Sequence, residues 1–453
     1  MADTRLHSDA RPRPFHGWTM LGIAIAMAFA TMPGQTVLVS LWKESIRESL
    51  GLSLTSVSAA YSIGTIIAAL PLSWVGRAAD RFGLRATVGV VAVGFALSLV
   101  LLREATGILS LGVGFFLVRF LGQGSLGMLS GHTVAMWFER RLGSVHALLT
   151  VFGFAAGGAI MPQPTAWLIA SYGWRTALLA LAGTVVMLVL PGVLFLFRNR
   201  PEEIGQHLDG DRAEHAHHDV LHGGAPPPGD PAFTARQAMR SSAYWILMSN
   251  VVATGFIGTA LIFHMPAMLA QAGLEGSAQQ AALAIQPWPI AFGVTTLGVG
   301  WLVDRAHPAK ILPASLVLMA MAIALCLAAT RGTFDAQLVV PVMAAGMGVY
   351  GASQAVITSV AGPTIARYFG RTYHGAIRGT VATATVMGTG AGPYAIALGH
   401  DLAGQDFTAA YLLCVALTLP LGVGAALLRE PLPPRSDAST PPSDIADPSG
   451  PPP

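Results

Sequence analysis

Long apolar stretches, separated by shorter polar ones, run through most of this 453-residue chain. A helix needs about 20 mainly apolar residues to cross the roughly 30 Å hydrocarbon core of a bilayer. Backbone polar groups find no water inside a bilayer, so apolar stretches of this length are expected to be helical. The pattern therefore predicts twelve membrane-spanning helices, at residues 17–42, 54–75, 86–102, 107–136, 143–170, 174–197, 243–270, 279–303, 310–330, 336–366, 375–400 and 407–428.

The composition supports an all-α membrane protein. Apolar residues make up 53% of the chain and charged residues 11%, whereas soluble domains carry about 25% charged residues. The first stretch has one alternative interpretation, a cleaved signal peptide, because Arg11 and Arg13 precede it and the residues up to Ala30 resemble a cleavage site. The stretch continues beyond Ala30 and eleven others follow, which favours an uncleaved first span.

The distribution of basic residues predicts the orientation. Loops that face the cytoplasm of a membrane protein are enriched in Lys and Arg. With a cytoplasmic N-terminus, 20 of the 26 basic residues fall on the cytoplasmic side. The segments on the other side hold five, namely Lys43, Arg47, Arg103, Arg175 and Arg331. We therefore expect a multi-pass protein of the cell's inner (plasma) membrane with both termini in the cytoplasm. The net charge of +3 then reflects topology, and no nucleic-acid partner is expected.

A polar stretch divides the chain into two similar halves. The expected organisation is a cytoplasmic tail at 1–16, six helices at 17–197, a cytoplasmic linker at 198–242, six helices at 243–429 and a disordered tail at 430–453. The linker's histidines leave metal binding open, but their irregular spacing favours a disordered segment; they are His207, His215, His217, His218 and His222. Cys326 and Cys414 lie inside spans, so neither a disulfide nor a metal site is expected, and no cofactor is expected.

Charged loops recur in the two halves at equivalent places. After the second span of each half the chain carries the pattern G-x-x-x-D-R, as "GRAADR" from Gly76 and "GWLVDR" from Gly300. A second pair follows the fourth span of each half, "WFERR" and "YFGRT". Duplicated units of this kind are typical of secondary transporters, in which the substrate site lies between the repeats near the bilayer midplane.

These motifs resemble those of the major facilitator superfamily. The stretch "GRAADRFGLR" is similar to the family's signature loop, and "RFLGQG" from Arg119 is similar to its fourth-span Arg-Gly motif. Several scaffold stretches also resemble the monocarboxylate and oxalate/formate carrier branch: "HGW", "WFERRLG", "YGWRTAL", "RNRPEEIG" and "YFGRTYHGAIRGT". The resemblance implies two pseudo-symmetric six-helix bundles.

The signature loop suggests gating residues. In the family, this loop forms a charge cluster that stabilises one access state and breaks during transport. The candidates are Gly76, Asp80, Arg81, Gly83 and Arg85 in the first copy, and Gly300, Asp304 and Arg305 in the second. The glycines permit a tight turn and close helix approach, and the arginines can bind helix C-terminal carbonyls. A loop that only sets topology is the alternative.

Arg119 is the principal candidate for substrate contact, because it alone among the basic residues falls in the middle of a predicted span. A charge at the bilayer centre costs about 2.5–3.5 kcal/mol even on lenient scales, so it should face a partner or a wet cavity. It can bind an anionic substrate or take part in proton coupling. Alternatively, it pins span four to carbonyls of span one.

Proton coupling has few candidates. All 23 acidic residues fall in loops, termini or span ends, which disfavours a buried carboxylate relay. His132 and His264 lie within spans, and histidine is the residue type whose ordinary pKa is near neutral, which suits a proton carrier. Packing roles are the alternative for both.

The remaining cavity candidates are polar or aromatic residues in spans that line the pore of this fold. They are Gln35, Thr36, Tyr61, Gln123, His264, Trp288, Gln354 and Tyr394. Interhelical hydrogen bonding is the alternative role for each. No basic residue follows Pro33 directly, and none occurs in "PWPIAFGVTTLGVGW" of span eight or "VATATVMGTGAGPYAIALG" of span eleven, which disfavours a dianion held by two cations.

The sequence thus predicts a secondary carrier that moves a small organic anion, such as a monocarboxylate, by alternating access. A carrier of a neutral or amphipathic compound and a non-transporting membrane sensor are the alternatives. No phosphate-cradling loop or nucleophile–base pattern is present, so neither ATP drive nor an enzyme is expected. The expected partners are a small-molecule substrate, a co-transported proton as an open alternative, and the lipid bilayer, with the protein acting as a monomer.

Overall fold

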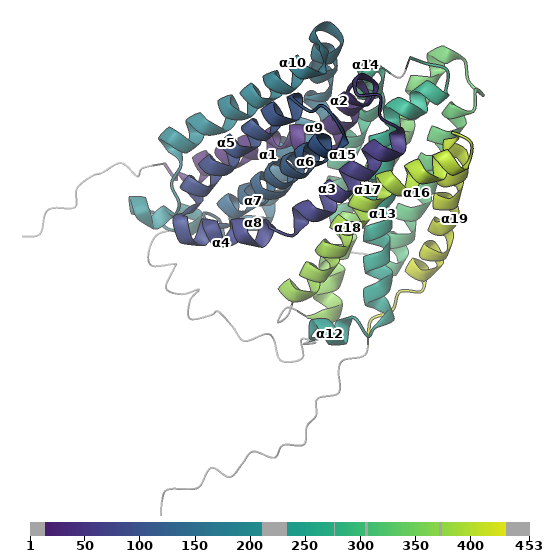
Figure 1. Ribbon diagram of the computed structural model, residues 1–453. Coiled ribbons are helices and arrows are strands. Elements are labelled where there is room, and N and C mark those ends of the chain that lie inside the picture. Colours follow the sequence, from purple (N-terminus) through teal and green to yellow (C-terminus); the bar gives the residue numbers. More distant parts are fainter. Residues whose placement is uncertain (1–13, 211–232, 276, 304–306, 371–373, 432–453) are drawn as a thin grey trace, which may run out of the picture.

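The computed structural model describes residues 14–210 and 233–431, apart from 276, 304–306 and 371–373. Every regular element in this described part is a helix. Helices of the N-terminal half form one set and those of the C-terminal half a second, and the two sets lie side by side (Figure 1). Four of the five linker histidines (His215, His217, His218 and His222), Asp304 and Arg305 lie outside the described residues, so their predicted roles stay predictions.

Several spans of the N-terminal set are built from more than one helical segment. This set comprises α1 (Gly17–Ala30), η1 (Met32–Gly34), α2 (Thr36–Ser49), α3 (Leu54–Ala69), α4 (Leu72–Phe82), α5 (Leu84–Arg103), α6 (Ile108–Val118), η2 (Arg119–Leu126), α7 (Gly127–Ala135), α8 (Leu142–Leu149), η3 (Thr150–Ala155), α9 (Ala156–Ile160), α10 (Pro162–Pro191) and η4 (Gly192–Leu196). Short turns η5 (Pro201–Ile204) and η6 (Leu208–Gly210) follow. Pro33 lies at the break between α1 and α2, where its missing N–H interrupts the helix.

The C-terminal set has longer uninterrupted helices. A short helix, α12 (Ala235–Ala238), precedes it. The set comprises α13 (Ser242–Gln271), α14 (Ala278–Ile285), α15 (Pro287–Val303), α16 (Pro308–Thr330), α17 (Ala336–Phe369), α18 (His374–Leu402) and α19 (Phe407–Ala426).

The order of the helices matches the predicted spans. Nine helical segments of the described part are long and apolar enough to cross a bilayer, or ten when the bent pair α3 and α4 counts as one span. One of them, Leu142–Leu196, contains a break at Gly173, whose φ of 79° suits glycine. This break divides it into the predicted fifth and sixth spans. Helix α18 is not among the nine, but its 29 residues are about 43 Å long at 1.5 Å per residue, enough to span.

The first span ends later than the sequence predicts. We expected it to stop at residue 42, but α2 continues to Ser49. Val39, Trp42 and Ile46 are fully buried and lie on one side of this extension, so packing sustains the helix through its charged residues. As a result Lys43, which we expected in an external segment, is fully buried.

The outer faces of the helices carry large exposed apolar side chains. Leu109 is 84% exposed and Phe195 is 74% exposed. Apolar surface on this scale is a liability in water but matches a hydrocarbon environment, in which polar groups are the costly ones. Together with the helix lengths, this surface identifies a multi-pass membrane protein.

The two sets pack against each other mainly at one end. We call this the closed end, defined by α2, α14 and the bend of α10 at Gly173, where α14 contacts both α2 and α10. At the opposite, splayed end, defined by α4, α8 and α12, the ribbons of the two sets diverge (Figure 1). Helices α3 and α18 also meet across the sets. At Gly390 of α18 a Cβ would lie 2.8 Å from Ile66 Cγ1, so a glycine allows this approach.

The signature loop lies at the splayed end. Gly83, with φ 84°, makes the turn between α4 and α5, whereas Gly76 lies inside α4 with open space around it, so the expected turn lies at Gly83 alone. Arg85 donates from Nε to the Val193 carbonyl, 2.9 Å away, and from Nη2 to the carbonyl of Leu194. These carbonyls lie at the C-terminal end of the sixth span, so Arg85 binds helix C-terminal carbonyls as expected. Asp80 and Arg81 are exposed. Their gating role stays a prediction.

Candidate functional site

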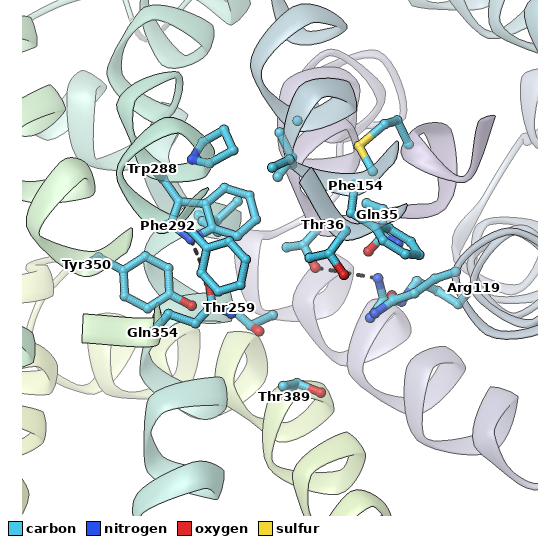
Figure 2. Close-up of a pocket in the computed structure, with 18 residues that line it drawn as sticks. Gln35, Thr36, Arg119, Phe154, Thr259, Trp288, Phe292, Tyr350, Gln354 and Thr389 are labelled. Atoms are coloured by element: carbon cyan, nitrogen blue, oxygen red, sulfur yellow. Dashed lines mark hydrogen bonds between the residues drawn. The ribbon is translucent and has the colours of Figure 1, made fainter. Parts of the chain in front are cut away.

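A cavity of about 300 Å³ lies between the two helix sets. Its walls come from α2, η2 and η3 on one side and from α13, α15, α17 and α18 on the other (Figure 2). Six predicted residues line it, namely Gln35, Thr36, Arg119, Gln123, Trp288 and Gln354. The cavity therefore lies between the repeats, where the duplicated sequence predicts a substrate site.

Arg119 is held at the edge of this cavity by groups from two neighbouring spans. Its Nε donates to Thr65 Oγ1 at 3.1 Å, and its Nη1 donates to the Gly34 carbonyl at 3.1 Å and to Thr36 Oγ1 at 3.5 Å. The guanidinium also lies 5.1 Å from the centre of the Tyr61 ring. Among the described residues no hydrogen bond from Nη2 is found, so the side chain keeps donors for a ligand while only 4% of its surface is exposed.

Local sequence explains why the guanidinium reaches this position. Arg119 begins η2, a π-helical segment, and such segments are common at functional sites. Gly34 lets span one approach the backbone of span four where α6 meets η2, because a Cβ there would lie 2.7 Å from the Val118 carbonyl oxygen and 3.0 Å from the Gln123 backbone nitrogen. The Gly34 carbonyl thereby comes within reach of Arg119. Both expected roles of this arginine, contact with span one and exposure to a cavity, coexist in the structure.

The opposite wall is aromatic. Trp288 and Tyr350 stack with their ring centres 6.2 Å apart and their planes 17° apart. Trp288 Nε1 donates to Gln354 Oε1 at 2.8 Å, which fixes the indole in place. Phe292 lies beside them, and all four side chains are grouped together across the cavity from Arg119 (Figure 2).

Three predicted cavity residues lie elsewhere, namely Tyr61, Tyr394 and His264. Tyr61 is fully buried behind Arg119, and its hydroxyl forms a 2.7 Å hydrogen bond with Thr36 Oγ1. Tyr394 is 39% exposed on α18 and does not line the cavity.

The two histidines proposed for proton coupling also lie outside the cavity lining. His264 is fully buried, and its Nε2 lies 2.8 Å from the Pro393 carbonyl oxygen. Because a carbonyl only accepts, Nε2 carries the proton. Within the described residues Nδ1 has no hydrogen-bond partner. His132 is half-buried on α7.

Sequence reasoning missed the other twelve lining residues, among them the aromatic or polar Phe154, Thr259, Phe292, Tyr350 and Thr389. Helical spacing contained a signal for two of them. Phe292 follows Trp288 by one helical turn, and Tyr350 precedes Gln354 by one turn, so each shares a helix face with a predicted residue. Phe154, Thr259 and Thr389 carry no such mark.

The space continues from the central cavity toward the splayed end. An adjoining cavity of about 250 Å³ shares Arg119, Gln123 and Thr389 with the first and extends to Leu72 at the start of α4. Gln123 Oε1 is buried and has no hydrogen-bond partner among the described residues. An unpaired buried acceptor costs free energy, so a ligand or water with a donor would be stabilised there. In the same part of the chain, no cluster of three or more His, Cys, Asp or Glu residues that could hold a metal occurs.

A comparison with protein families finds a match over most of the chain. The family described as Major Facilitator Superfamily matches residues 23–349 and 276–449 of the chain. These ranges cover both helix sets.

Two curated bacterial proteins resemble the chain over most of its length. The gallate transporter of Pseudomonas putida is 25% identical over 421 residues, which cover 85% of this chain and 88% of that protein. The 4-hydroxybenzoate transporter PcaK of Pseudomonas putida is 28% identical over 375 residues, which cover 75% of this chain and 78% of that protein. Both names specify aromatic acids, so the narrower resemblance to monocarboxylate carriers is not confirmed.

Solved structures share the fold at low sequence identity. The nucleoside transporter NupG aligns with a TM-score of 0.67 and 13% identity, over 91% of this chain and 98% of that one. A D-xylose-proton symporter aligns with a TM-score of 0.66 and 15% identity, over 90% and 96%. A bacterial homologue of the lysosomal transporter Spinster, in an inward-facing and occupied conformation, aligns with a TM-score of 0.63 and 13% identity, over 92% and 95%. These likenesses confirm the predicted two-bundle fold.

Proposed function

Because the chain belongs to the major facilitator superfamily, whose members are transporters and not enzymes, we propose that it carries a small aromatic carboxylate across the membrane by alternating access. The carboxylate binds Arg119, and the ring lies against Trp288, Phe292 and Tyr350. The observation that carries this proposal is the pairing of one guanidinium with an aromatic wall on opposite sides of a single cavity.

The charge of Arg119 supports an anionic cargo. A hydrogen bond to a charged group is worth about 1.5–3 kcal/mol, which corresponds to roughly a 10- to 150-fold change in binding constant. Planar guanidinium groups match carboxylates in geometry. Three of the contacts around the guanidinium are to neutral oxygens of Gly34, Thr36 and Thr65, so its positive charge has no carboxylate partner in these contacts.

The size and lining of the cavity support a small aromatic cargo. Ligand pockets commonly measure about 300–1,000 Å³, so a volume of about 300 Å³ suits a ligand near the lower limit. Aromatic pairs contribute about 0.5–1.5 kcal/mol beyond area burial. The relatives that carry gallate and 4-hydroxybenzoate add support from sequence for the same class of cargo.

We further propose that the splayed end faces the cytoplasm of a bacterial inner membrane together with both termini. The excess of Lys and Arg in the loops of that end supports this orientation. The carrier is proposed to act as a monomer, with each chain enclosing its own cavity. A proton accompanying the anion would neutralise its charge; His132 and His264 remain the proposed proton carriers.

Transport in proteoliposomes tests the proposal. Labelled benzoate and 4-hydroxybenzoate are compared with lactate, with cyclohexanecarboxylate as a non-aromatic ring and with benzamide as a neutral aromatic, each with and without a pH gradient. The two aromatic acids should be preferred, and Arg119→Gln should lower their uptake at least tenfold. Arg119→Lys should restore part of it. Arg240→Gln, which removes an exposed cation near α12, should leave uptake unchanged.

Two outcomes would contradict the proposal. Uptake of benzoate by Arg119→Gln at the parent rate would remove the anion contact. Uptake of benzamide as fast as benzoate would favour a neutral cargo, which is the alternative that the sequence left open.

A further inference from the structure

Lys43 is fully buried where the two helix sets meet at the closed end. It projects from α2 and lies 4.6 Å over the centre of the Phe263 ring on α13. A lysine ammonium is strongly hydrated in water, and lysine is rarely fully buried unless it is paired. The central cavity does not use this side chain, so its burial calls for a separate explanation.

The charge around Lys43 is only partly balanced. Its Nζ lies 3.1 Å from Glu44 Oε2. The other carboxylate oxygen, Oε1, pairs with Arg47. Glu48 lies 3.9 Å from Arg47 and is mostly exposed, so water screens it. One well-placed carboxylate, Glu44, therefore serves two cations, so the positive charge of Lys43 beside Phe263 is only partly balanced.

Two aromatic rings separate Lys43 from Arg119. The guanidinium of Arg119 lies against the Tyr61 ring, the ring centres of Tyr61 and Phe263 are 4.5 Å apart, and Phe263 in turn lies against Lys43. Among these four residues Phe263 alone belongs to the C-terminal set. Separation of the sets at the closed end would therefore remove Phe263 from Tyr61 and from Lys43 in one movement.

We propose that Lys43 is a second carboxylate-binding site, which takes the same aromatic anion when the closed end opens. This inference rests on the proposed function for its cargo class. In the closed state the Phe263 ring lies against the Lys43 ammonium. In the open state a carboxylate of the cargo replaces the ring and balances the remaining positive charge of Lys43. The cargo ring then takes the place of Phe263 near Tyr61.

The position of Lys43 on its helix suits a transfer to the central site. Thr36, which contacts Arg119, and Lys43 are seven residues apart, or two turns of helix, and so lie on the same face about 10.5 Å apart. A small aromatic acid spans much of that distance. When the closed end opens and Phe263 withdraws, the anion can therefore pass from Lys43 to Arg119 along this face of α2.

Chemical labelling tests the site directly, because the chain contains only two lysines, Lys43 and Lys310. Lys310 is exposed at the start of α16, at the splayed end, and serves as the internal control. Proteoliposomes are treated with a membrane-permeant acetylating reagent for amines, which reaches both ends of the protein, with and without 4-hydroxybenzoate, and each lysine is quantified by mass spectrometry. We expect Lys43 to be acetylated slowly, and 4-hydroxybenzoate to slow the acetylation of Lys43 at least fivefold. The acetylation of Lys310 should not change with 4-hydroxybenzoate. The neutral analogue 4-hydroxybenzamide should not protect Lys43.

The variant Arg119→Gln separates this site from the central one. Protection of Lys43 by 4-hydroxybenzoate should persist in Arg119→Gln, since the anion binds Lys43 itself. Protection lost in that variant would mean that it came from the central site, and Lys43 that never reacts would mean that it stays sealed; either result overturns the proposal. Labelling needs no transport, so it gives an answer even where the uptake assay contradicts the proposed function.

Transport kinetics supply a second measurement. Lys43→Gln should raise the half-saturating concentration of 4-hydroxybenzoate about tenfold for transport that starts from the closed end, and less than twofold from the splayed end. Lys43→Arg should restore the parent value. Arg331→Gln, which removes an exposed cation at the same end, is the control for general surface charge. Equal changes from both sides would assign Lys43 a packing role alone.

Discussion

The substitution Gly34→Ala tests the seat of Arg119 without changing any polar group. A Cβ at Gly34 would lie 2.7 Å from the Val118 carbonyl oxygen, 3.0 Å from the Gln123 backbone nitrogen and 3.2 Å from Gly122 Cα. All three atoms belong to the backbone of span four, so no side-chain rotation relieves the contact. Span one must move away from η2, and the Gly34 carbonyl must move with it.

The size of the effect follows from overpacking, which typically costs about 1–3 kcal/mol. The matched control is Gly22→Ala in α1, where nothing lies within 4 Å of the added Cβ. Alanine at such a helical position should stabilise by roughly 0.5–1 kcal/mol. The two variants should therefore differ by about 1.5–4 kcal/mol in the free energy of unfolding, with opposite signs relative to the parent.

The assay is thermal unfolding of the purified protein in detergent, followed by benzoate uptake in proteoliposomes. Gly34→Ala should unfold at a lower temperature than the parent and lose most of its uptake, because the 3.1 Å hydrogen bond from Arg119 to the Gly34 carbonyl is disturbed. Gly22→Ala should match or exceed the parent in both measurements. If Gly34→Ala is as stable and as active as Gly22→Ala, the close packing of spans one and four does not position Arg119.

Three further predictions follow from the same contacts. Trp288→Phe keeps a ring but loses the 2.8 Å hydrogen bond to Gln354, so the half-saturating benzoate concentration should rise about 2- to 10-fold. Adding Gln354→Ala to this variant should raise that concentration no further. An additive rise would contradict the role of this bond. Tyr61→Phe keeps the ring contacts but loses the 2.7 Å hydrogen bond to Thr36, so benzoate uptake should fall by about 2- to 10-fold. Tyr61→Ala also loses the ring and should abolish uptake. Equal losses in both variants would show that the Tyr61 ring contacts do not matter. A hydrogen bond from a backbone N–H at the start of α19 is the main cause that lowers the pKa of Asp406 from 3.8, so its contribution to stability is present above about pH 4 and is lost as pH falls through the folded pKa. Asp406→Ala should therefore lower the free energy of unfolding by about 0.5–2 kcal/mol at pH 7 and by less at pH 3. A difference that does not change with pH would refute this.

Much of the fold could be predicted because membrane helices follow from local composition. Each span needs a run of apolar residues of a set length, and that run is visible without any tertiary contact. The recurrence of G-x-x-x-D-R at Gly76 and Gly300 likewise shows a duplication in the chain itself. A mid-span charge such as Arg119 is so costly in hydrocarbon that the sequence alone assigns it to a partner or a wet cavity.

The aromatic wall could be predicted only in part. Trp288 and Gln354 stood out as polar or large residues in pore-lining spans, and their helical neighbours Phe292 and Tyr350 share their faces. In a chain in which apolar residues are the rule, however, a phenylalanine that lines a cavity has the same sequence signal as one that faces lipid. Which face of each helix points inward is settled by packing between helices.

The sequence by itself therefore determined the helices, their duplication and the one cation at mid-span, because each follows from residue type and local spacing. Only the tertiary structure decided that α2 continues through Lys43 and that this charge is buried against Phe263 of the other half. It also decided that Arg119 faces the aromatic wall of Trp288, Phe292 and Tyr350, whose residues lie more than 160 positions away in the chain. The physical reason is that a helix end or a contact between bundles depends on what packs against it, and the packing partners lie far away in sequence.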